Sequence, residues 1–134
     1  MSASVAPHAR PDLAAHEEVV RMTLPQVVER LTNELGAKLV AYIGSVAETR
    51  AVRQWMIEGS NHRKPKGDTP NRLRESLTIT LMLRSRDSKA TVQAWLMGLN
   101  PQLDDQSPAT LLRDSDEQGI AAVRGAARAF LIGG

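Results

Sequence analysis

Apolar residues recur every three or four positions over much of this chain, which is the spacing of one face of an α-helix. The clearest example begins at Thr23, where Pro25 suits a first helical turn and Gln26 completes a Thr-x-x-Gln capping box. Gly36 supplies a stop signal. Between these signals one apolar face is formed by Leu24, Val27, Val28, Leu31 and Leu35.

The same reasoning predicts further helices along the rest of the chain. Two short ones cover about 38–43 and 47–57, and a polar, basic loop follows over 60–70. Thr69-Pro70 and Ser88 can each open a helix, and Ser107-Pro108 can open another. The last helix carries Ile120, Val123, Ala127 and Phe130.

Residues 77–83 fit two periods equally well. Leu77, Ile79, Leu81 and Leu83 alternate with Thr78, Thr80 and Met82, as in a strand. The helical neighbours and the cap at Thr69-Pro70 favour a helix here. We therefore predict an all-α protein.

Composition agrees with this fold class and limits the chemistry. Among 134 residues only 3% are aromatic, and a core of Leu, Val, Ala and Met favours helices. There is no cysteine, so disulfides and thiolate sites are excluded. No apolar run is long enough to span a membrane, and no secretory signal is visible. We expect a cytoplasmic protein, with residues 1–22 forming an N-terminal arm.

Charge is distributed unevenly. Residues 1–35 carry a net charge of −2, residues 36–89 carry +6, and residues 90–134 carry −2. The basic middle part predicts contact with an anion. It also contains a short helix, a Gly-Ser turn at Gly44-Ser45 and a second helix, which fits a helix-turn-helix over 38–59.

A helical projection of residues 47–58 separates two faces. Ala51, Val52 and Trp55, with Glu48 at the edge, form the side that would pack on preceding helices. The other side presents guanidinium and amide groups that match base edges in a major groove. The candidate DNA-binding residues are Thr49, Arg50, Arg53, Gln54, Arg63, Lys64 and Lys66, with Arg72 and Arg74 as further phosphate contacts. The alternative is that these arginines only solvate a helix face.

The C-terminal third contains Ala94-Trp95-Leu96, Leu99-Asn100-Pro101, Leu103, Ser107-Pro108 and Leu111-Leu112, and then Val123, Ala126, Ala127 and Phe130. This order resembles the toxin-binding domain of Xre/MbcA/ParS-type antitoxins. Val52-Arg53-Gln54-Trp55, Glu58-Gly59 and Pro65 similarly resemble the recognition helix and exit of Xre-type domains. Gly59 lies one residue farther from the tryptophan than in that pattern, and the loop to Pro70 is long.

The resemblance implies a DNA-binding part over 23–87 and a small toxin-binding-like helical domain over 88–134. It implies an antitoxin that represses its own operon and holds a RES-domain, NAD-consuming toxin inactive. The implied partners are operator DNA, the toxin and a second copy of the chain, as a homodimer or larger oligomer. Toxin contacts are expected at Arg124, Arg128, Phe130, Leu131 and Ile132. The last two would enter the cleft of the toxin, while Phe130 would anchor the helix. The alternative is a tail whose Phe130 simply packs on Leu111 and Leu112.

Catalysis is not expected. His8, His16 and His62 are scattered, and no carboxylate pattern makes them a metal set. No phosphate-binding glycine motif is present, so neither a metal nor a cofactor is predicted. Two other functions remain open: a stand-alone helix-turn-helix regulator without a toxin, and an interaction module whose basic centre binds an acidic protein.

Overall fold

The computed structural model describes residues 10–59 and 64–133, and within these ranges all regular secondary structure is helical. This confirms the predicted all-α class. The helices are α1 (Pro11–Val20), α2 (Leu24–Leu35), α3 (Ala37–Ile43), α4 (Thr49–Trp55), α5 (Thr69–Arg84), α6 (Lys89–Met97), the 3₁₀ helix η2 (Pro101–Leu103), α7 (Pro108–Asp114) and α8 (Glu117–Gly133). The ambiguous segment at 77–83 is part of α5.

Several predicted start signals form the hydrogen bonds expected of them. Thr23 and Gln26 make the complete capping box of α2, with side chains bonded to each other's backbone N–H. Ser88 caps α6 by accepting from the N–H of Thr91. Ser107 does the same for α7 with the N–H of Thr110. These local signals therefore account for where α2, α6 and α7 begin. In contrast, α5 begins at Thr69 after Asp68, whose side chain makes no capping hydrogen bond.

Part of the N-terminal arm forms a packed helix, α1. In α1, Ala15 and Val19 are buried against α5, whereas Leu13 and Val20 point to solvent. Asp12, near the start of α1, accepts a hydrogen bond from the guanidinium of Arg128 on α8. Residues 1–9 of the arm lie outside the described residues.

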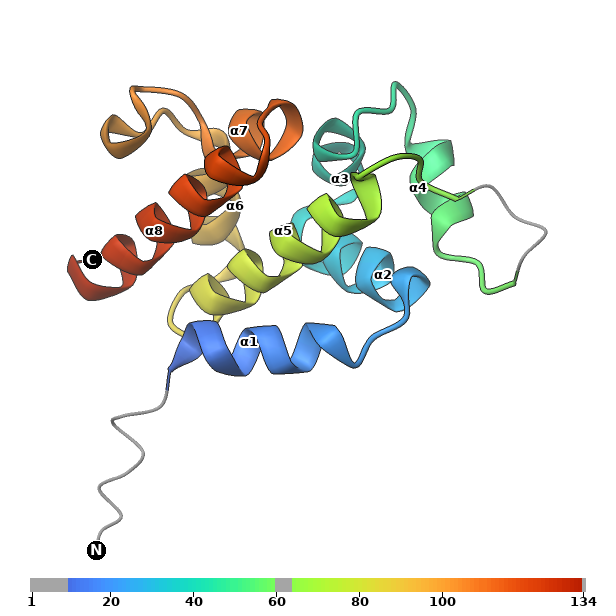
Figure 1. Ribbon diagram of the computed structural model, residues 1–134, viewed down its shortest axis with the longest axis horizontal. Coiled ribbons are helices and arrows are strands. Elements are labelled where there is room, and N and C mark those ends of the chain that lie inside the picture. Colours follow the sequence, from blue (N-terminus) through green and yellow to red (C-terminus); the bar gives the residue numbers. More distant parts are fainter. Residues whose placement is uncertain (1–9, 60–63, 134) are drawn as a thin grey trace, which may run out of the picture.

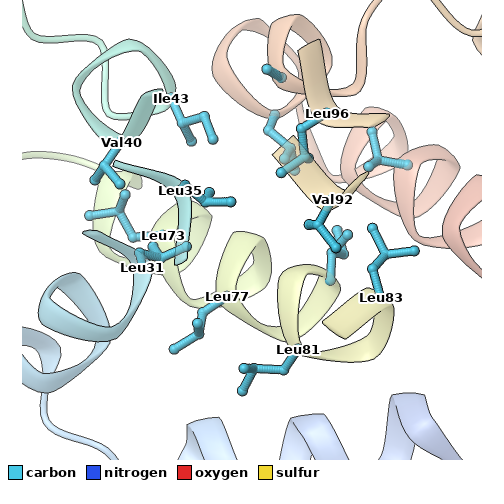
Figure 2. Close-up of a cluster of buried hydrophobic side chains, with 14 of the residues drawn as sticks. Leu31, Leu35, Val40, Ile43, Leu73, Leu77, Leu81, Leu83, Val92 and Leu96 are labelled. Atoms are coloured by element: carbon cyan, nitrogen blue, oxygen red, sulfur yellow. The ribbon is translucent and has the colours of Figure 1, made fainter. Parts of the chain in front are cut away.

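Helix α5 is the centre of the structure (Figure 1). It contacts α1, α2, α6, α7 and α8, and every residue from Ser76 to Leu83 is buried. Figure 2 shows its leucines directed to several sides, with Leu73 near Leu31 and Val40, and Leu83 near Val92. Because this helix is covered on all sides, its apolar residues do not gather on one face, which explains why no amphipathic period distinguished it from a strand.

The remaining helices flank α5 at its two ends. Helices α2, α3 and α4 lie toward one end of the long axis, and α6, α7 and α8 lie toward the other (Figure 1). One continuous cluster of buried side chains includes residues from both groups. Helix α3 also contacts α7 directly, so the segments predicted as 23–87 and 88–134 share a packed boundary.

Candidate nucleic-acid interface

The predicted helix-turn-helix segment forms two short helices, α3 and α4, joined by residues 44–48. The turn is tight at Gly44, where an added Cβ would lie 2.8 Å from Cζ3 of Trp55. Ser45 has a φ of 59°, in the left-handed region, and the N–H of Val46 bonds to the carbonyl of Ala41. Glycine at position 44 therefore lets the indole of α4 lie against the turn.

Helix α4 has one buried and one exposed side, as the projection predicted. Val52 and Trp55 are buried, and they hold α4 against α2 and α3. Arg50 and Arg53 are exposed, and Gln54 is half-buried. The Nη1 of Arg53 donates to Oγ1 of Thr49 at 3.3 Å, one turn earlier. Thr49 therefore orients the guanidinium of Arg53 along the exposed face.

The predicted DNA-binding cations differ from most other cations in their electrostatic partners. Seven arginines elsewhere pair with carboxylates within the chain: Arg10, Arg30, Arg72, Arg84, Arg113, Arg124 and Arg128. In contrast, Arg50, Arg53, Lys64 and Lys66 form no ion pair with any residue of the described ranges. Their charge remains available to an external anion.

The loop lysines lie close to α4. Lys64 and Lys66 line a hollow together with the turn residues Gly44 and Ser45 and with Trp55. The structure thus places these lysines beside the turn and the Trp55 side of α4. Arg63, the remaining predicted phosphate contact, lies outside the described residues.

Arg72 and Arg74 are placed differently from the expectation. Arg72 pairs with Asp68 and donates to the backbone carbonyls of Arg113 and Ser115, which ties α5 to the end of α7. The Nη1 of Arg74 donates to the carbonyls of Val19 and Met22 at the end of α1. Both guanidinium groups hold neighbouring segments together, so we remove them from the phosphate contacts. Sequence reasoning counted their charge but had no information about these carbonyls.

A second hollow lies beside the exposed face of α4. It is lined by Val46, Ala47, Glu48, Arg50, Ala51 and Gln54. Glu48 is exposed and precedes the first residue of α4, although the projection had placed it at the edge of the inner face. The hollow combines small apolar groups with a carboxylate, a guanidinium and an amide, all of which can contact base edges.

The predicted toxin-contact residues occupy varied environments on α8. Arg124 pairs with Glu75 of α5 at 2.6 Å, and Arg128 pairs with Asp12 at 3.2 Å. Leu131 is buried, and its carbonyl accepts from Arg86. Ile132 is 87% exposed, so the end of α8 presents a bulky apolar side chain to water.

Phe130 lies against Trp95 of α6, with ring centroids 6.0 Å apart and planes tilted by 48°. The sequence had suggested Leu111 and Leu112 as its neighbours in the simplest case. Together the two rings border a groove with Leu99, Pro101 and Ala129. Leu99 is 77% exposed and lies beyond the end of α6 at Met97.

Asp12 is the described carboxylate whose ionisation is clearly perturbed. The hydrogen bond from the Arg10 guanidinium is the largest cause and holds the pKa of this carboxyl well below its usual range. Partial burial opposes the shift, and the bond from Arg128 adds to it. Because Arg128 belongs to α8, ionised Asp12 fastens the first helix to the last.

The described residues contain no group of three or more potential metal ligands. None of the described helices is long and apolar enough to cross a membrane. Comparison of the chain with protein-family models, with curated proteins and with solved structures gives no match.

Proposed function

We propose that this protein is a DNA-binding antitoxin of a type II toxin–antitoxin system. It binds operator DNA through α4 and the loop lysines, and it binds a RES-domain toxin through the C-terminal helices. The observation that carries the DNA-binding half is a set of cations on and beside α4 without carboxylate partners among the described residues. Arg50 and Arg53 lie on the exposed face of α4, and Lys64 and Lys66 line the hollow next to Trp55.

Support for the partner-binding half comes from the opposite end of the molecule. Leu99 is strongly exposed there and lines the Trp95–Phe130 groove, and the exposed Ile132 lines a separate hollow with Arg10 and Arg128. Exposed apolar groups that border a groove are typical of protein-binding surfaces. The C-terminus and α4 lie at opposite ends of the long axis (Figure 1). DNA and a toxin can therefore occupy the same molecule without direct competition for space.

The DNA-binding half is tested with the DNA upstream of the gene. The Arg50→Ala/Arg53→Ala double variant should lose most of its affinity, because each base-edge contact contributes about 1–3 kcal/mol. A matched control is Arg21→Ala/Lys89→Ala, which removes two exposed cations outside α4 and the loop. Equal affinity of the double variant and the wild type, with both folded, would reject this placement.

The partner-binding half is tested by co-expression with the adjacent gene product. A stable complex that suppresses toxicity supports the proposal, and Ile132→Asp should weaken it while leaving DNA binding intact. Val20→Asp is the matched control, because Val20 is also an exposed aliphatic residue but lies on α1. A protein that represses its operon and yet binds no product of a neighbouring gene is a stand-alone regulator.

A further inference from the structure

The carboxylate of Glu48 has no structural role in the described part of the protein. Glu48 occupies the position before α4, with extended backbone at φ −129° and ψ 145°, and its side chain makes no capping hydrogen bond. It forms no ion pair with a described residue. Short oxygen-bearing side chains are preferred at such a position because they accept from the free N–H groups of the first turn. The glutamate side chain accepts none of these N–H groups.

Glu48 lies among side chains that can contact a base pair. It is the single acidic residue of the hollow that also contains Arg50 and Gln54, above Val46 and Ala51. In a major groove, guanine offers two acceptors to an arginine, and its paired cytosine offers the N4 amino group to a carboxylate. One hollow therefore carries groups that match both halves of a G·C pair.

A carboxylate among DNA-binding cations also weakens binding to DNA sequences that offer it no hydrogen-bond donor. It is repelled by phosphates and loses hydration on entering the groove, and only a hydrogen-bond donor on a base offsets that loss. Specificity arises when a group weakens binding to wrong partners as well as favouring the right one. Glu48 has the charge and the position to do both.

We infer that Glu48 is a specificity-determining residue, which accepts a hydrogen bond from the N4 amino group of a cytosine and lowers affinity for other sequences. This inference rests on the proposed DNA-binding function. Arg50 is the neighbouring side chain that would contact the paired or adjacent guanine. Glu48 thus sets selectivity, while the arginines and lysines supply most of the attraction.

The test begins with selection of the wild-type protein on a pool of random-sequence DNA duplexes. Affinities are then measured for the preferred duplex, a scrambled duplex and a duplex with one C·G pair replaced by T·A. The variants are Glu48→Gln, which removes the charge, and Glu48→Ser, which also supplies a capping oxygen. Glu17→Gln is the control, because Glu17 is an exposed carboxylate on α1.

Both Glu48 variants should lower the preferred-to-scrambled affinity ratio about tenfold, because a charged hydrogen bond to a base is lost. Their affinity for scrambled DNA should rise, and most strongly at low salt. The T·A replacement should weaken the wild type more than Glu48→Gln, because only the wild type loses the hydrogen bond between Glu48 and cytosine. Glu48→Ser should also melt at a higher temperature, whereas Glu17→Gln should keep the wild-type ratio.

Selective DNA binding by the wild type with the same ratio in both variants overturns the inference and leaves the proposed function standing. A wild type that binds none of these duplexes overturns both.

Discussion

The phenolic hydroxyl of Tyr42 lies 3.0 Å from the hydroxyl of Thr110, although the two residues are 68 positions apart in the chain. The guanidinium of Arg113 stacks 4.6 Å from the centre of the same ring. Tyr42 belongs to α3, which also contacts α4, and Thr110 belongs to α7, which also contacts α8. The pair therefore connects the proposed DNA-binding end with the proposed partner-binding end.

Removal of this hydroxyl contact should have a small and specific cost. Tyr42→Phe keeps the ring under Arg113 and should lower the free energy of unfolding by about 0.5–1 kcal/mol, because the contact is exposed. Thr110→Val tests the other partner. In a double-mutant cycle measured by urea unfolding, the double variant should lower the free energy of unfolding by less than the sum of the two single variants. Additive effects would show that the hydroxyls do not interact in solution.

Gly44 and Gly125 should respond to alanine with opposite signs. At Gly44 the new Cβ would lie 2.8 Å from the Trp55 ring, so the turn or the indole must shift. Gly44→Ala should therefore lower the free energy of unfolding by about 1–3 kcal/mol. At Gly125, within α8, the new Cβ meets nothing within 4 Å. Gly125→Ala should therefore stabilise the protein by about 0.5–1 kcal/mol through helix propensity. Thermal unfolding of the two variants compares the positions directly, and equal shifts would contradict the close approach.

Glu34 should be much more important for stability than Glu18, although both contact Arg30. The side chain of Glu34 is nearly buried and accepts from Nε of Arg84 at 2.7 Å, which joins α2 to α5. Glu34→Ala leaves Arg84 partly desolvated without its partner and should cost about 2–4 kcal/mol. Glu18 is half-exposed, so Glu18→Ala should cost less than about 1 kcal/mol. Denaturant unfolding of both variants provides the measurement. Similar losses of unfolding free energy in the two variants would mean that the Glu34–Arg84 pair contributes no more to stability than the exposed pair.

Acid should loosen the attachment of α1 through Asp12. Because the folded state lowers the pKa of this carboxyl, its contribution to stability is complete above the unfolded-state value of about 4. That contribution is lost as the pH falls below 4 toward the folded-state pKa. Asp12→Asn should therefore reduce stability at pH 6 and reduce the dependence on pH between 4 and 2. An unchanged pH profile in this variant would exclude Asp12 as a source of acid sensitivity.

Local signals in the sequence predicted the helical class and several helix starts, because caps such as Thr23–Gln26 depend on neighbouring residues. Spacing also separated Val52 and Trp55 from Arg50 and Arg53 on α4, since one short helix has two distinct faces. Long-range partners were not predictable in this way. Arg74 bonds to carbonyls more than 50 positions away, and Phe130 packs on Trp95. Such contacts depend on how helices meet, which apolar spacing does not encode.

The enclosed position of α5 has a consequence for turnover of the protein. Any opening that frees one flanking group of helices exposes leucines of α5 that also support the other group. The chain should therefore melt in a single cooperative transition, and partial opening should be rare. A protease that requires an unfolded segment would then meet either a resistant molecule or a wholly unfolded one. Loss of the DNA-binding end and loss of the partner-binding end would occur together.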